Sequence, residues 1–210
     1  MRATLVHGEP LELDLAWLRR HFASAEPPEQ PLYGDQGPRP ERSSLTPASV
    51  LVPIVARSAE LTVLFTERSV RLKAHSGQVS FPGGRDEPHD ASPEATALRE
   101  TREEIGLDPR HVELLGRLPE YHTRTGFRIT PVVGIVSPPF ELSPDAFEVE
   151  KVFEVPLSFL LDPRHHERRS REWQGELRWF FAIPYQGHYI WGATAGMLVN
   201  LYRFLAQASR

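Results

Sequence analysis

Three glutamates stand close together in residues 93–106, and their spacing carries more chemical information than any other feature of the sequence. Glu100 and Glu104 are four residues apart, and Glu103 lies between them. In a helix, positions i and i+4 share one face, with Cβ atoms about 6 Å apart. Three like charges held this closely repel one another, so either water screens them or a cation lies among them.

Mg²⁺ is the cation that this arrangement favours, because it prefers hard oxygen ligands and commonly binds through a few carboxylates together with substrate phosphates. Taken alone, an acidic helix face is more often solvated surface, with Arg99 and Arg102 as salt-bridge partners. The Phe-Pro-Gly-Gly segment upstream changes that balance. Gly83 and Gly84 allow the backbone to approach a ligand closely, and a carbonyl there could complete the coordination of a metal.

Residues 84–107 resemble the Nudix box, G-x5-E-x7-R-E-U-x-E-E-x-G-U, in which U is a bulky apolar residue. The half that begins at Arg99 matches with the correct internal spacing, and Gly84 matches the first glycine. There are three departures: Asp90 stands where the first glutamate is expected, one extra residue separates it from Arg99, and Thr101 fills an apolar position. The first two weaken any role carried over to Asp90, whereas threonine is small and can pack.

The resemblance implies the Nudix fold, an α/β (α+β) architecture with a mixed β-sheet sandwiched between helices, and an enzyme that hydrolyses a pyrophosphate bond. It implies Mg²⁺ or Mn²⁺ as the cofactor. Glu100 and Glu104 are expected to be its main ligands, with Glu103 and the Gly84 carbonyl assisting.

The resemblance also implies the catalytic roles. Arg99 is expected to orient a catalytic glutamate through a charge-assisted hydrogen bond. The general base is left open between Glu103 and Glu148, because Nudix enzymes can recruit a carboxylate from a later loop.

Residues 64–84, LFTERSVRLKAHSGQVSFPGG, resemble the motif of coenzyme A pyrophosphatases, L-L-T-x-R-[SA]-x3-R-x3-G-x3-F-P-G-G. Phe65 replaces a leucine, and Lys73 replaces an arginine, which keeps the charge but loses the guanidinium fork. Coenzyme A carries a pyrophosphate and a ribose 3′-phosphate, so its binding site needs cations near the metal. The candidates for substrate binding are the basic residues around this loop: Arg68, Arg71, Lys73 and Arg85.

The predicted reaction is therefore the Mg²⁺-dependent hydrolysis of coenzyme A or acyl-coenzyme A to 3′,5′-ADP and (acyl-)4′-phosphopantetheine. A pyrophosphatase for another nucleoside diphosphate derivative, such as ADP-ribose or a dinucleotide, is the first alternative, and the change at Lys73 keeps it open. A Nudix-shaped binding module without catalysis is the second. The presence of all three helix carboxylates argues against it.

The glutamates require a helix over Pro93–Ile105. Ser92 is the predicted N-cap, proline occupies the first turn, and Gly106 ends the helix. The glutamates are expected on the polar face. The buried face is expected to carry Ala97, Leu98, Thr101 and Ile105.

The remaining pattern predicts a helix at 11–22, a proline-rich linker at 25–47 and a hairpin at 50–57 and 61–67. Strands are expected at 78–81, 112–119 and 127–136, a helical turn at 156–161, a hairpin over 172–184 and a closing helix at 193–206. This pattern divides the chain into an N-terminal extension, residues 1–48, and a Nudix hydrolase domain, residues 49–210.

Composition narrows the classes of partner. The 210 residues are 40% hydrophobic and 25% charged, which is typical of a globular protein. The absence of cysteine excludes disulfides, thiolate zinc sites and a cysteine nucleophile. A net charge of −4 argues against nucleic acid as a partner, and no apolar stretch suits a membrane span or a signal sequence. We expect a cytoplasmic enzyme with a small-molecule substrate and no membrane partner.

Overall fold

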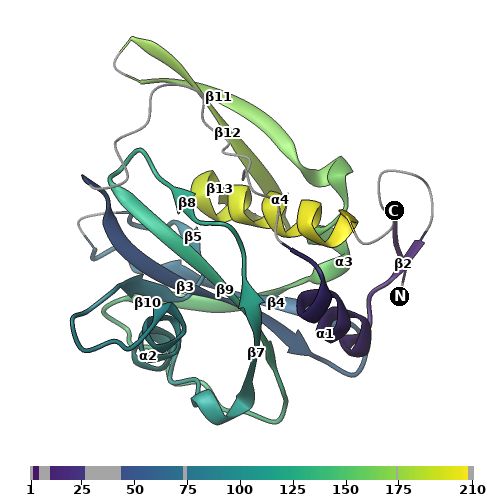
Figure 1. Cartoon of the computed structure of the whole chain (residues 1–210). Coiled ribbons are helices and arrows are strands. Elements are labelled where there is room, and N and C mark those ends of the chain that lie inside the picture. Colours follow the sequence, from purple (N-terminus) through teal and green to yellow (C-terminus); the bar gives the residue numbers. More distant parts are fainter. Residues whose placement is uncertain (1, 5–9, 27–43, 73–74, 174, 208–210) are drawn as a thin grey trace.

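The computed structural model describes residues 2–4, 10–26, 44–72, 75–173 and 175–207 (Figure 1). Its helices are α1 (Leu15–Ser24), α2 (Pro93–Ile105), α3 (Leu157–Leu160) and α4 (Gly192–Ala206). Its strands are β1 (Arg2–Thr4), β2 (Pro10–Glu12), β3 (Thr46–Ala56), β4 (Leu61–Arg68), β5 (Val79–Ser80), β6 (Gly83–Arg85), β7 (Val112–Arg117), β8 (Tyr121–His122), β9 (Phe127–Val136), β10 (Val149–Pro156), β11 (Glu167–Trp173), β12 (Glu176–Tyr185) and β13 (His188–Trp191).

A mixed sheet forms the centre of the molecule, with the strand order β10-β4-β3-β9-β7. Strands β3 and β9 run parallel along the whole of β9, from Thr46 opposite Phe127 to Val55 opposite Val136, and the other neighbours are antiparallel. The short strands β5, β6 and β8 pair with β4, β3 and β9. The predicted hairpin of β3 and β4 forms with Ile54 opposite Val63, and the strand predicted at 127–136 is confirmed as β9.

Strand β3 is buried on both faces, and its side chains alternate between two apolar clusters. Leu51 and Val55 pack with residues of α2, while Val50, Val52 and Ile54 pack with residues of α4. Figure 1 shows these two helices on opposite sides of the sheet. The predicted architecture, a mixed sheet between helices, is therefore confirmed.

A smaller antiparallel sheet of β11, β12 and β13 leads into α4. The hairpin predicted over 172–184 is present, but its arms extend from Glu167 to Tyr185. The sequence pattern does not predict strand β10, because its charged residues interrupt the alternation of apolar and polar positions that is typical of a strand. It pairs with β4 at the edge of the main sheet, with a bulge between Val149 and Lys151, so one side of it faces solvent.

The N-terminal helix begins later than predicted. The Asp14 carboxylate accepts a hydrogen bond from the Trp17 backbone N–H at 2.6 Å, so the helix starts at Leu15, and residues 10–12 form β2 instead. Leu18 is fully buried, and the His21 ring is within 3.0 Å of the Phe204 carbonyl oxygen of α4. Residues 27–43 of the predicted linker lie outside the described residues. Within the described part of the chain, no helix is long and apolar enough to cross a bilayer.

Candidate active site

Helix α2 has the predicted bounds. The Ser92 hydroxyl accepts a hydrogen bond from the Ala95 backbone N–H at 3.3 Å, and Pro93 occupies the first turn, where its missing N–H costs nothing. At the other end Gly106 has a φ of 71° and donates its N–H to the Arg102 carbonyl. Local sequence alone therefore fixes the helix that carries the glutamates.

The orientation of this helix differs from the prediction at Glu104. Ala97, Thr101 and Ile105 are buried as expected, but Leu98 is only half-buried. Glu104, which was expected on the polar face, is 4% exposed. Helix α2 packs against both β3 and β6, so the residue faces the glycine strand rather than solvent.

The two glycines of the Phe-Pro-Gly-Gly segment lie in the short strand β6, which pairs with β3, and each is required for a different reason. A Cβ at Gly83 would lie 2.4 Å from the Ser49 carbonyl oxygen, and the φ of 151° also favours glycine. A Cβ at Gly84 would lie 2.4 Å from the carboxyl carbon of Glu100. The Gly83 N–H donates to the Glu104 carboxylate at 3.2 Å. The structure thus brings Gly84, Glu100 and Glu104 together.

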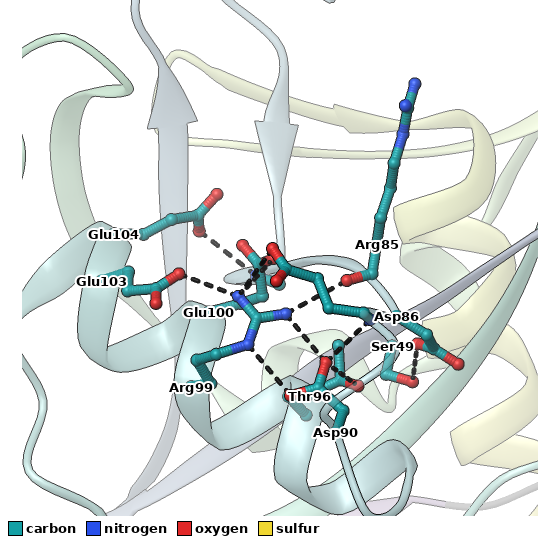
Figure 2. Close-up of polar contacts among 12 residues, drawn as sticks. Ser49, Arg85, Asp86, Asp90, Thr96, Arg99, Glu100, Glu103 and Glu104 are labelled. Atoms are coloured by element: carbon teal, nitrogen blue, oxygen red, sulfur yellow. Dashed lines mark hydrogen bonds and ion pairs between the residues drawn. The ribbon is translucent and has the colours of Figure 1, made fainter.

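Arg99 lies at the centre of a network of carboxylates (Figure 2). Its Nε and Nη2 donate to the two oxygens of Asp90 at 3.0 and 2.9 Å, while Nη1 donates to Glu100 and Glu103 at 2.9 Å each. Nη2 also donates to the Arg85 carbonyl at 3.2 Å. Hydrogen bonding lowers the pKa of Asp90 and raises the pKa of Arg99.

Asp90 is thus the residue whose importance the sequence understated. Its carboxylate also accepts hydrogen bonds from the Thr96 hydroxyl and the Glu87 backbone N–H, each at 2.9 Å. The extra residue before Arg99 does not prevent the bidentate pair, because the connection preceding α2 folds back onto the helix. One indication of this role is present in the sequence, because Asp90 stands where the Nudix box has its first glutamate.

The carboxylates of the cluster destabilise one another's charged forms. Burial is the main cause that raises the pKa of Glu104 to about 8, and the charges of Glu148 and Glu100 act in the same direction. Burial also raises the pKa of Glu100, with added repulsion from Glu103 and Glu148. Hydrogen bonds from Gly83 and Arg99 oppose these shifts only in part. Glu148 is therefore near enough to act electrostatically on both residues.

Two backbone hydrogen bonds hold the segment 145–148 beside the helix, although Glu148 is 44 positions from Glu104 in the sequence. The Asp145 N–H donates to the Glu104 carbonyl at 2.9 Å, which caps the end of α2. The Ser69 N–H, just after β4, donates to the Glu148 carbonyl at 2.8 Å. Residue 148 is thus fixed between the helix and the end of a neighbouring strand, with an exposed side chain.

Arg68, the last residue of β4, is the basic candidate that lies in the cluster. Its Nη1 is 3.7 Å from a carboxylate oxygen of Glu104. Its Nε is buried without a hydrogen-bond partner among the described residues. Lys73 lies outside the described residues.

Arg71 and Arg85 are not part of the carboxylate network through their side chains. The Arg71 guanidinium lies 5.8 Å from the centre of the Phe147 ring, and that of Arg85 lies 5.5 Å from the centre of the Phe127 ring. Figure 2 shows the Arg85 side chain pointing away from the carboxylates, while its carbonyl faces Arg99.

The NUDIX domain family profile matches residues 45–181, which is more than half of the chain. The chain belongs to the Nudix family. It is 43% identical over 159 residues to a protein of Citrobacter koseri named "Uncharacterized Nudix hydrolase NudL", covering 73% of this chain and 80% of that protein. A Cronobacter sakazakii protein of the same name is 43% identical over 173 residues, covering 78% and 86%.

The fold also agrees with a solved structure of the family. The crystal structure of RenU, a Nudix hydrolase from M. smegmatis, matches with a TM-score of 0.53 over 77% of this chain and 86% of that chain, at 17% identity. The prediction of a Nudix hydrolase is thus confirmed, and its substrate and metal are matters for proposal.

Proposed function

We propose that this Nudix hydrolase uses Mg²⁺, or Mn²⁺, to hydrolyse the pyrophosphate bond of coenzyme A or acyl-coenzyme A. The products would be 3′,5′-ADP and (acyl-)4′-phosphopantetheine. The observation that carries the proposal is the convergence of Glu100, Glu104 and Arg68 on the Gly83–Gly84 strand. Carboxylates there suit a divalent cation, and the arginine beside them suits a phosphate.

The donor set fits a hard dication. Glu100 and Glu104 offer carboxylate oxygens whose raised pKa values reflect burial and mutual repulsion, which a divalent cation would relieve. In the part of the chain that the structure describes, no three acidic or histidine side chains are placed to hold a metal ion as they stand, so the proposed site needs the Gly84 carbonyl or substrate oxygens beside the two glutamates. We assign Glu100 and Glu104 as the main ligands, with Glu103 and the Gly84 carbonyl assisting. The bound ion would neutralise charge developing on the pyrophosphate and lower the pKa of a bound water.

Asp90 and Arg99 would act as positioning residues. The bidentate pair fixes the guanidinium, and the remaining nitrogen holds one oxygen each of Glu100 and Glu103. This keeps the two glutamates in defined rotamers while their other oxygens stay available. The wild-type arrangement therefore reduces the reorganisation that ligand binding would require.

Glu148 is the better supported of the two candidates for general base. Its carboxylate makes no hydrogen bond within the described residues, and its charge acts on Glu100 and Glu104. Glu103 instead gives one oxygen to Arg99 at 2.9 Å. A base must be able to accept the proton of the attacking water, and a carboxylate open to solvent beside the ligands meets that need.

The choice of coenzyme A rests on the arrangement of residues 64–84. The segment that resembles the coenzyme A pyrophosphatase motif forms β4, β5 and β6, and these strands bring Arg68 and the glycines to the same carboxylates. A substrate with a pyrophosphate and a separate phosphate would use the cations that this segment supplies.

A substrate panel tests the proposal. Coenzyme A, 3′-dephospho-coenzyme A, acetyl-coenzyme A, ADP-ribose and a dinucleoside polyphosphate would be incubated with the enzyme and Mg²⁺, and products identified by mass. We expect 3′,5′-ADP from coenzyme A, and a kcat/KM for coenzyme A well above that for its 3′-dephospho form. A higher kcat/KM for ADP-ribose or the dinucleotide would overturn the assignment in favour of a broader nucleotide pyrophosphatase.

A further inference from the structure

Two apolar side chains are exposed beside the carboxylate cluster. Val70 is 70% exposed and Phe147 is 71% exposed. These are the two highest exposed fractions among the large apolar side chains in the described part of the chain. Phe147 directly precedes Glu148, and Val70 follows Arg68 by two positions. Exposed apolar surface next to a reaction site is typical of a place where ligand binds.

The backbone holds this surface in place. The Phe147 N–H donates to the Asp145 carboxylate at 2.8 Å, and Asp145 in turn caps helix α2. On the other side, the Val70 carbonyl accepts a hydrogen bond from the Ser76 hydroxyl at 3.2 Å. The bond from the Ser69 N–H to the Glu148 carbonyl joins the two segments. The surface is thus built into the rim of the site.

A cation accompanies the aromatic ring. The Arg71 guanidinium lies 5.8 Å from the centre of the Phe147 ring, within the range of a cation–π contact. One side of the rim therefore offers a flat apolar face and a positive charge together. A ligand that uses both must carry a planar ring and an anionic group near each other.

We propose that Phe147 and Arg71 form the subsite for the nucleoside half of the substrate, with the purine base packed against Phe147 and the ribose phosphate contacting Arg71. The inference rests on the proposed function, because it takes coenzyme A as the substrate. Aromatic rings bind bases through stacking, and guanidinium groups bind phosphate bidentately. The pantetheine arm would use the apolar surface but would leave the cation of Arg71 without a role.

The test measures dissociation constants by calorimetry on the whole protein with Mg²⁺, using AMP, 3′,5′-ADP and 4′-phosphopantetheine as separate probes. We expect Phe147→Ala to weaken AMP and 3′,5′-ADP by about tenfold, the typical effect of losing one base stack, and to leave 4′-phosphopantetheine unchanged. Arg71→Met should weaken 3′,5′-ADP by about tenfold and AMP by less than about twofold, as for loss of one phosphate contact.

Matched controls remove similar side chains elsewhere. Leu177 is 59% exposed on β12, and Arg110 pairs with Asp108 beyond the end of α2. Leu177→Ala and Arg110→Met should bind all three probes like the wild type.

Two results would overturn the inference. If Phe147→Ala weakened only 4′-phosphopantetheine, the surface would belong to the arm of the substrate. If neither variant changed the binding of either nucleotide, the subsite would lie elsewhere. Failure of the proposed function would look different, because the wild type would then leave coenzyme A intact while Phe147→Ala still weakened AMP.

Discussion

Replacing Glu104 with glutamine should lower activity and raise the stability of the metal-free protein. The residue is 4% exposed, and burial raises its pKa from 4.5 to about 8. Between these values the folded protein holds a proton that the unfolded chain has released. The free energy of unfolding therefore falls as pH rises from about 4.5 to about 8, and above about pH 8 this residue no longer makes it depend on pH.

The magnitude follows from the distance between the two pKa values. At pH 7 the pH is about 2.5 units above the pKa of this carboxyl in the unfolded chain, and each pH unit corresponds to about 1.4 kcal/mol. Ionisation of the carboxyl in the unfolded state therefore lowers the free energy of unfolding by about 3 kcal/mol. Glutamine removes this term and can still accept from the Gly83 N–H. Its amide nitrogen would lie near Arg68, so we expect a net gain of roughly 1–3 kcal/mol. In a chain of this size that corresponds to a rise in Tm of roughly 2–10 °C.

Activity should change in the opposite direction. A neutral amide is a poorer ligand for a hard dication, so kcat should fall by at least about a hundredfold. The assays are Tm in chelator from pH 5.5 to 8.5 and kcat at saturating Mg²⁺. Glu150→Gln, at an exposed position of β10, is the matched control and should change neither.

Two outcomes would refute the reasoning. Near-normal kcat for Glu104→Gln would remove the residue from the proposed ligands. A lower Tm, or a slope with pH equal to that of the wild type, would show that the buried carboxyl does not destabilise the fold.

Three further results are expected. Chelation should abolish turnover, and Mg²⁺ or Mn²⁺ should restore it; turnover that persists in excess chelator would exclude a metal mechanism. Asp90→Ala should lower both Tm and kcat, because the Arg99 guanidinium loses its bidentate partner, and Asp90→Glu should preserve both in part. An unchanged kcat would show that Arg99 does not need this pair to position the glutamates. Glu148→Gln should lower kcat about a hundredfold with little change in Mg²⁺ affinity, and a larger kcat loss in Glu103→Gln would assign the base there.

Local signals in the sequence were enough to predict the elements that carry the site. Ser92 and Gly106 mark the two ends of α2, and hydrophobic runs mark β3, β4 and β9. These features depend on neighbouring residues, so spacing reveals them. The carboxylate helix and the glycines before it are therefore predictable from the sequence alone.

Features that depend on contacts between distant segments were not predicted. The burial of Glu104 depends on how α2 is rotated against β6, and helical periodicity gives the relative angle of residues but not the absolute orientation. Strand β10 carries charges that face solvent at a sheet edge, which removes its alternation. The pairing of Asp90 with Arg99 depends on the path of the preceding connection, which an added residue made uncertain from sequence.

The burial of Glu104 connects the fold to the chemistry, because three separate segments meet at this one residue. The strand β6 donates to its carboxylate, β4 supplies Arg68 beside it, and the Asp145 N–H binds its carbonyl. The last contact fixes Glu148 and Phe147 by the same turn. The ionised form of a carboxyl group enclosed in this way destabilises the fold. A cation bound between the three segments would offset that cost, and such a cation can bind only when the segments are folded together. Divalent cations should therefore stabilise the native state more as pH rises, since the ionised fraction of Glu104 grows over the same range.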